Sequence, residues 1–196
     1  MFKNASRALA IAVTVLSAAV ANSQTPDADW SGFYIGGMRG STSADEFMHY
    51  EQNGSVTSIY DMYQGRPSGI FAGYNHQTGQ WLIGGELGLT EYNTGYLLSG
   101  TDYALDRGVE LRLRGGYVIG RALTYGFVGL STSHWEADYS YDVSGLNYGG
   151  GVEVLVTDTV FVGFEYISRE MSGMGTGGYS GHAAFDATQI RVGMRF

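Results

Sequence analysis

The chain has 196 residues, enough for one domain, and contains no cysteine, which excludes a disulfide framework and a thiolate metal site. Glycine (31 residues) and tyrosine (15) are abundant, proline (2) is scarce and only 15% of the residues are charged, so the composition favours a β protein over a helical bundle. The net charge of −8 disfavours nucleic acid as a partner, because nucleic-acid binding requires a basic surface.

The first 21 residues have the features of a secretory signal peptide. Lys3 and Arg7 give a positive start, residues 8–20 are apolar, and residues 19–21 form a small-x-small cleavage site. We expect cleavage after residue 21, or alternatively after residue 23. Residues 22–29 would then be a periplasmic spacer and residues 30–196 a single barrel domain with a net charge near −10, because two basic residues are removed. No later run of eighteen apolar residues exists, which excludes membrane-spanning helices.

From residue 30 onward the chain alternates between segments with a two-residue period and polar segments. A two-residue period is typical of β-strands that have different environments on their two faces. We expect eight strands, at residues 30–40, 65–76, 81–91, 107–119, 122–132, 146–156, 159–168 and 186–196. Short turns at 77–80, 120–121 and 157–158 alternate with long loops at 41–64, 92–106, 133–144 and 169–185. This asymmetry predicts an all-β, antiparallel, up-and-down transmembrane barrel.

The last strand has the clearest alternation. One face is apolar and the opposite face carries two arginines. The apolar face comprises Ile190, Val192, Met194 and Phe196; the other face comprises Gln189, Arg191, Gly193 and Arg195. We expect lipid on the first face and a polar interior on the second. The fifth strand, residues 122–132, is ambiguous, and we expect Leu123, Tyr125 and Phe127 to point outward.

The polar faces of the expected strands carry four glutamates and four arginines. They are Glu86, Glu110, Glu153, Glu165, Arg112, Arg114, Arg191 and Arg195. A soluble barrel of lipocalin type would show the same period with the faces exchanged. A soluble barrel needs a water-facing exterior, yet Lys3 is the only lysine in the whole chain with which to build one. In a membrane barrel, an arginine that faces lipid near the midplane costs about 2–4 kcal/mol. The charges are therefore expected in the lumen.

An eight-stranded lumen is only wide enough for side chains to fill it. The eight charges are therefore expected to pair with one another inside the barrel. Both a structural plug and a gate whose glutamate–arginine partners exchange are consistent with this set. Aromatic side chains at the strand ends are expected as interfacial girdles, with Trp30 and Trp81 on the turn side and Tyr92 and Trp135 on the loop side.

No catalytic, cofactor-binding or metal-binding residue is expected. Ser133 and His134 are residue types found in hydrolases, but adjacent residues on a strand point in opposite directions. The acidic loops lack the spacing of a calcium-binding loop, and a solvated surface explains them better. The histidines lie in loops or at strand ends, so the chain is expected not to be an enzyme.

Three features resemble the small outer-membrane β-barrel family of Gram-negative bacteria. They are the W-x-G-F-Y-x-G motif at residues 30–36, the eight-strand layout and the terminal V-G-M-R-F. The family includes opacity-type surface proteins and the membrane domain of outer membrane protein A. The resemblance implies contact with outer-membrane lipid and lipopolysaccharide. It also implies insertion by the outer-membrane assembly machinery, which reads a final strand such as Ile190, Val192, Met194 and Phe196.

The expected function is that of an integral outer-membrane barrel in the cell envelope. Its role would be structural or one of surface interaction, with weak porin-like conductance as a further property; the loop partner is unknown. Two alternatives remain open: a narrow ion channel gated by lumen glutamate–arginine pairs, and a lipid-modifying barrel enzyme. The peptidoglycan-binding domain of outer membrane protein A is missing from this sequence, so tethering to the cell wall through such a domain is not expected.

Overall fold

The structure is a computed structural model that describes residues 27–43, 46–50, 56–61, 63–98, 101–136, 141–174 and 180–196. The expected signal peptide and the first part of the expected spacer lie outside these residues. The strands are β1 (Gly32–Thr42), β2 (Glu46–Tyr50), β3 (Val56–Asp61), β4 (Ser68–Thr78), β5 (Trp81–Leu98), β6 (Thr101–Ile119), β7 (Ala122–Glu136), β8 (Tyr141–Leu155), β9 (Val160–Met174) and β10 (Ser180–Arg195).

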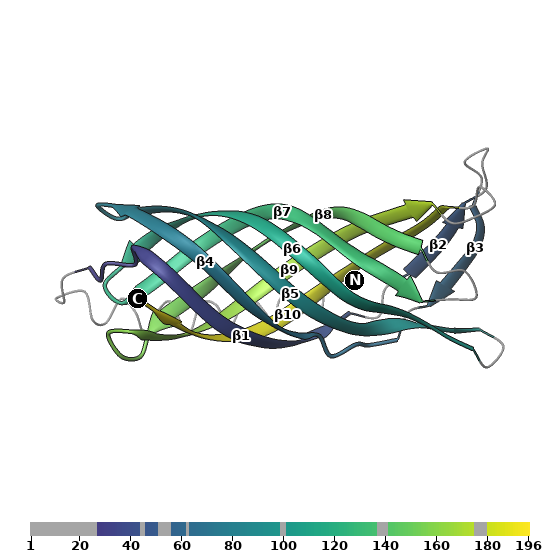
Figure 1. The fold of residues 1–196 in the computed structure, drawn as a ribbon, viewed down its shortest axis with the longest axis horizontal. Helices are drawn as coiled ribbons and strands as arrows, with labels where there is room; N and C mark the ends of the chain where they lie inside the picture. Colours follow the sequence, from purple (N-terminus) through teal and green to yellow (C-terminus); the bar gives the residue numbers. More distant parts are fainter. Residues whose placement is uncertain are drawn as a thin grey trace.

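The strands form one antiparallel sheet that closes on itself. Each of β4 to β10 pairs with its neighbour in sequence, β1 pairs with β4, and β1 also pairs with β10 to complete the ring. Figure 1 shows the strands tilted around a common axis, with the short turns at the end where the C-terminus lies. Closure leaves the ring strands with partners on both sides, which is the condition for a sheet to exist in lipid.

The two short strands, β2 and β3, continue β1 and β4 beyond the point where β1 leaves the ring. The pairing of β1 with β10 ends at Thr42 opposite Ala187, and β2 resumes along the same edge of β10 with Phe47 opposite Ala183. The antiparallel pairing of β1 with β4 continues in the same register between β2 and β3. In the described residues the ring therefore has eight members, and the expected all-β antiparallel barrel is confirmed.

The outer face of the ring is apolar over the middle of the strands. Its large exposed side chains include Ile35 on β1, Leu113 on β6 and Ile190 on β10. Val192, Met194 and Phe196 lie on this face, as expected from the period of the last strand. Trp81 is 70% exposed and packs edge-on against Tyr117 with ring centroids 5.0 Å apart. An apolar outer face opposite a charged inner face is typical of a barrel that spans a membrane, so the apolar belt is the surface expected to meet hydrocarbon.

The expected facing of β7 was wrong. Leu123 is fully buried and Tyr125 and Phe127 point into the barrel, whereas Val128 is 53% exposed on the outer face. The register across the two-residue turn explains this outcome, because residues directly opposite each other share a face of the sheet. Val128 pairs with the outward-facing Leu113, so the alternate residues of β7 must point inward.

The four expected long loops are largely strand. For example, β9 continues to Met174 and β10 begins at Ser180, inside the segment expected to be a loop. In this part of β9 the polarity reverses: Met171 points inward and is buried, while Glu170 and Ser172 are exposed. The reversal is expected where a strand leaves hydrocarbon and its outer face meets water. A search for apolar outer faces therefore misses these extensions.

The facing of β7 predicts the cost of placing a charge on it. Replacing Val128, in the middle of the belt, with arginine should lower the free energy of unfolding by about 2–4 kcal/mol, because the guanidinium enters hydrocarbon. Thr132 lies on the same face at the rim of the belt, and its replacement with arginine should cost about 0–1 kcal/mol. Urea titration of the barrel in phospholipid vesicles, followed by tryptophan fluorescence, measures both values. Equal costs at the two positions would contradict the assigned facing.

Candidate functional site

Eight charged side chains are buried in the lumen within the described residues, and none is more than 4% exposed. They are Glu86 on β5, Glu110, Arg112 and Arg114 on β6, Glu153 on β8, Glu165 and Arg169 on β9, and Arg191 on β10. We call this set the lumen charge network. Its four carboxylates and four guanidiniums balance, so no net charge is buried. Alternation places these side chains on the inner face, opposite the apolar belt.

Glu86 accepts hydrogen bonds from three strands, β1, β6 and β10. The Arg191 Nη1 atom donates to Glu86 Oε1 at 3.0 Å, and a second bond joins Arg191 Nη2 to Glu86 Oε2. Arg112 Nη1 and Arg114 Nη1 each lie 3.5 Å from a carboxylate oxygen of Glu86. One carboxylate is therefore shared by three guanidiniums, and the bidentate contact with Arg191 is the closest of them.

Glu165 contacts two of these arginines, Arg112 and Arg191, from the opposite side of the lumen. It accepts from Arg112 Nη1 at 2.9 Å and from Arg191 Nη1 at 3.0 Å. The Tyr125 hydroxyl also donates to it, at 2.8 Å. Each of these arginines thus contacts both Glu86 and Glu165, so the carboxylates and guanidiniums form a continuous network across the barrel rather than separate pairs.

Two further carboxylates extend the network along the barrel axis. Glu110 accepts from Arg112 Nη2, from Arg169 Nε at 2.9 Å and from the Tyr92 hydroxyl at 2.9 Å. Glu153 accepts from Arg114 Nη2 at 2.7 Å. Every carboxylate of the set therefore has at least one guanidinium donor, which offsets the cost of removing it from water.

Aromatic rings cover the faces of the guanidiniums. The Arg191 carbon Cζ lies 3.8 Å from the ring centroid of Phe71, and Arg114 Cζ lies 3.9 Å from that of Tyr125. Arg112 stacks in the same way on Phe127 at 4.6 Å. A guanidinium is weakly hydrated and planar, so it can hydrogen-bond in its plane while its faces meet rings. Such stacking fills the space around the charges without additional polar groups.

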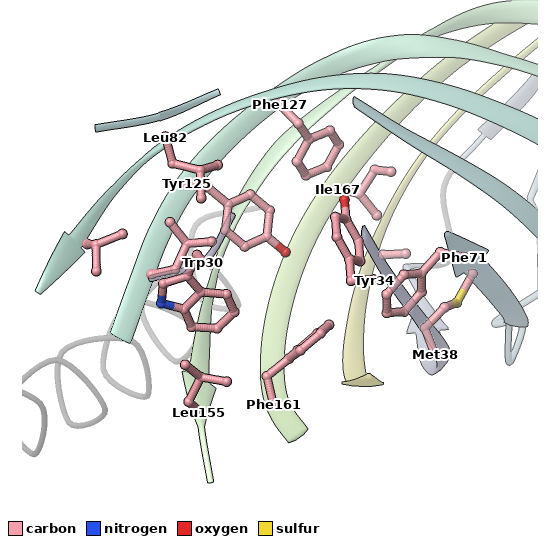
Figure 2. Close-up of a cluster of buried hydrophobic side chains, with 13 residues drawn as sticks. Trp30, Tyr34, Met38, Phe71, Leu82, Tyr125, Phe127, Leu155, Phe161 and Ile167 are labelled. Atoms are coloured by element: carbon pink, nitrogen blue, oxygen red, sulfur yellow. The ribbon is translucent and has the colours of Figure 1, made fainter. Parts of the chain in front are cut away.

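The turn-side part of a hydrophobic cluster fills the lumen below the network; it comprises Trp30, Leu82, Val118, Leu123, Leu155 and Phe161. Figure 2 shows its side chains pointing inward from the surrounding strands, with Trp30 and Phe161 next to each other. Their ring centroids are 5.8 Å apart, and Trp30 is only 2% exposed. Tyr34 links the two layers, because its ring contacts Phe161 and its hydroxyl donates to Glu86 at 3.0 Å.

Trp30 is held in the lumen by hydrogen bonds between the segment before β1 and the short turns. Ala28 N donates to Gly120 O at 2.7 Å, and Trp30 N donates to Gln77 Oε1 at 2.7 Å. In the same segment the Ser31 N–H donates to Asp29 Oδ1 at 2.8 Å, which lowers the pKa of this carboxyl below its ordinary value. The side chain of Trp30 therefore closes the turn-side mouth of the barrel.

Several sequence-based assignments change in the structure. Arg195 has inward parity but lies outside the network, and its Nε donates to Asp158 O at 2.9 Å on the rim. The turn-side part of the hydrophobic cluster occupies the lumen at the depth of Arg195, so this side chain points to the turn-side mouth. Trp30 is buried inside the barrel and is not an interfacial aromatic. Tyr92 is also in the lumen, while the Trp135 side chain lies outside the described residues.

Arg169, and not Arg195, is the fourth buried guanidinium, and it was not expected from the sequence. It was placed in a loop, although its position has the same parity as Glu165. The hydroxyl donors Tyr34, Tyr92 and Tyr125 were also missed as members of the site. The inward facing of Tyr125 is indicated by its pairing with Gly151, because a Cβ atom added to Gly151 would lie 2.8 Å from the tyrosine hydroxyl. A glycine opposite an aromatic residue leaves room for an inward-pointing ring.

The described residues contain no group of three or more histidines, aspartates or glutamates placed to hold a metal ion. Ser133 is buried and its hydroxyl donates to Arg107 O at 3.0 Å, so this side chain serves the backbone of β6.

Removing one guanidinium from the network should destabilise the barrel strongly. Replacing Arg191 with methionine leaves Glu86 and Glu165 short of a donor in a buried site, which should lower the free energy of unfolding by about 3–5 kcal/mol. Arg195→Met on the same strand is the matched control and should cost about 1 kcal/mol or less, because Arg195 lies on the rim. Urea titration in vesicles measures both, and a small, equal effect of the two changes would contradict the network.

Comparisons with known proteins agree with this architecture. Residues 8–196 match a family model described as outer membrane protein beta-barrel domain. The chain is 27% identical over 180 residues to a 22 kDa outer membrane protein of Rhizobium leguminosarum bv. viciae, covering 87% of this chain and 80% of that protein. OprG from Pseudomonas aeruginosa has a similar fold, with a TM-score of 0.51 and 13% identity, covering 88% of this chain and 98% of OprG. Because the family model spans nearly the whole chain, the protein belongs to the outer membrane β-barrel family and resides in the outer membrane.

Proposed function

We propose that this protein is a closed structural barrel of the outer membrane rather than an open pore. The observation that carries the proposal is the filling of the lumen by two successive layers. The lumen charge network occupies the middle, with no member more than 4% exposed, and the hydrophobic cluster around Trp30 and Phe161 occupies the turn side. A solute would have to separate paired charges and then cross a layer of packed aromatic rings.

The strand extensions beyond the belt suggest how such a barrel contributes to the cell envelope. β2 and β3, together with the far ends of β5 to β10, project past the apolar belt on the side opposite the short turns (Figure 1). In outer-membrane barrels this side is extracellular. We infer a role in surface interaction for this projection, with the tightly filled lumen as its rigid base; the chemistry of the loop partner stays open.

The last strand supports insertion by the outer-membrane assembly machinery as part of this proposal. Ile190, Val192, Met194 and Phe196 lie on its lipid-facing side, where they are accessible along β10. The outer belt also implies direct contact with membrane lipid and lipopolysaccharide. Neither contact requires a cofactor or a catalytic group.

A narrow ion channel is the second candidate, and one observation favours it. Glu86 is shared by Arg112, Arg114 and Arg191, so a guanidinium that moves away leaves the carboxylate with other donors. Exchange of partners in such a shared set could open a path for small ions. A lipid-modifying enzyme has no comparable support, since Ser133 is engaged with the backbone of Arg107.

Planar-bilayer recording separates the closed barrel from the channel. We expect the wild-type protein to produce no current steps above those of the detergent control, because the lumen is filled. Glu86→Gln tests the network, and Glu91→Gln on the same strand is the control, because Glu91 lies on the outer face and its side chain is 49% exposed. Wild-type steps that change with Glu86→Gln and not with Glu91→Gln would establish the channel and reject the closed barrel.

A further inference from the structure

Three arginines project from the outer face of the barrel at the border between the apolar belt and the extracellular extensions. They are Arg39 on β1, Arg66 just before β4 and Arg107 on β6, and all three are exposed. Arg39 and Arg107 lie in one row across the sheet, because Arg39 pairs with Ser68, Ser68 with Glu91, and Glu91 with Arg107. With a strand spacing of about 4.8 Å, this row spans roughly 14 Å.

Arg66 lies next to Arg39 on the same face. Gly40 N donates to Pro67 O at 2.8 Å and Thr42 N donates to Gly65 O at 3.0 Å, so the ladder between the two strands continues past the start of β4. This register places Arg66 opposite Ser41, the next outward position on β1 after Arg39. Diagonal neighbours of this kind are about 7–8 Å apart, so two long side chains at these positions can contact the same anion.

The two neighbouring guanidiniums have no ion-pair partner among the described residues. Arg107 differs, because its Nε lies 3.0 Å from Glu91 Oε1. Two other acidic residues lie nearby: Asp142 lines a surface hollow together with Arg107, and Asp186 on β10 lies opposite Ser43, one outward position farther from the belt than Arg66. Within the part of the chain that the structure describes, Arg39 and Arg66 therefore present two positive charges without an ion-pair partner, on a chain whose overall charge is negative.

A surface hollow lies beside Arg39. The hollow has a volume of about 790 Å³, and its lining includes the polar Arg39, Ser41 and Ser68 and the apolar Phe164, Ile190 and Val192. A second hollow, of about 690 Å³, lies on the other side of Ser68. There Arg107 and Glu91 stand above Ile70, Leu89 and Val109. Both hollows thus have a charged edge at the headgroup level and apolar walls at the level of the acyl chains.

We propose that Arg39 and Arg66 bind a phosphate of one lipopolysaccharide molecule, whose acyl chains lie in the hollow over Phe164, Ile190 and Val192. An arginine pair suits a phosphate because each guanidinium can donate two parallel hydrogen bonds to its oxygens. The lipid A part of lipopolysaccharide carries a phosphate at each end of a disaccharide and several acyl chains. Arg107 lies across the sheet above the second hollow, and the phosphate at the other end of the disaccharide lies near it in this arrangement. A phospholipid has one phosphate and two chains and would leave one hollow unused.

This proposal rests on the location of the barrel in the outer membrane and does not depend on whether the lumen conducts. Barrel refolded from urea into detergent without lipopolysaccharide is titrated with bisphosphorylated lipid A, and bound lipid is counted by native mass spectrometry. The test variant is Arg39→Gln/Arg66→Gln. The matched control is Arg121→Gln/Arg195→Gln, which removes the same charge on the periplasmic rim, where both arginines contact Asp158.

We expect the Arg39/Arg66 variant to bind lipid A about tenfold or more weakly than the wild type, and the control variant to bind as the wild type does. Dephosphorylated lipid A should bind the wild type as weakly as intact lipid A binds the variant. A difference in electrophoretic mobility between unheated and boiled samples checks that each variant is folded. Equal affinities of the folded wild type and variant would overturn the proposal, as would phosphatidylglycerol that binds as tightly as lipid A.

Discussion

The structure depends on one constraint: a strand that crosses hydrocarbon can carry charge only on the side that faces away from lipid, and that side must be neutral as a whole. An isolated buried ion costs several kcal/mol, whereas four carboxylates and four guanidiniums in mutual contact satisfy one another. The network reaches across the lumen because Arg112 and Arg191 each contact both Glu86 and Glu165. Strands far apart in the sequence are thereby held in one register, and the inner face of each strand is distinguished from the outer face.

The polarity of a strand reverses where the strand leaves the membrane. Within the belt, β9 has Glu165 and Arg169 inside and Val162 and Tyr166 outside. Farther along the same strand Met171 is inside, and its neighbours on the other face are polar and exposed. Two residues, Arg39 and Ile190, mark this border on the outer face, because they pair with each other across β1 and β10. A polar headgroup and an apolar chain can therefore be held side by side at this height.

The apolar belt could be predicted from the sequence because the alternation of apolar and polar residues is visible within each strand, without knowledge of its neighbours. Ile190 to Phe196 show this clearly, and the short turns could be placed in the same way. Two kinds of feature could not be found by alternation alone. The facing of β7 can be assigned only from its register with β6 across the turn, because Tyr125 and Val128 are both apolar enough to lie on either face. The pairing of Val128 with Leu113 shows that Val128 faces outward. The positions of Trp30 and Arg195 depend on their depth along the barrel axis. At the turn-side mouth the lumen is apolar, so Trp30 packs into the cluster and Arg195 stays on the rim.

Coupled charges, and not independent contacts, hold the lumen together. A double-mutant cycle on Arg114 and Glu153, whose Nη2 and Oε2 atoms are 2.7 Å apart, tests this coupling most directly. Unfolding free energies are measured in vesicles for Arg114→Met, Glu153→Gln and the double variant. We expect the double variant to lose clearly less stability than the sum of the two single variants, because neither charge is left buried alone. Additive losses would show that the two charges are independent and that the lumen charges are not coupled.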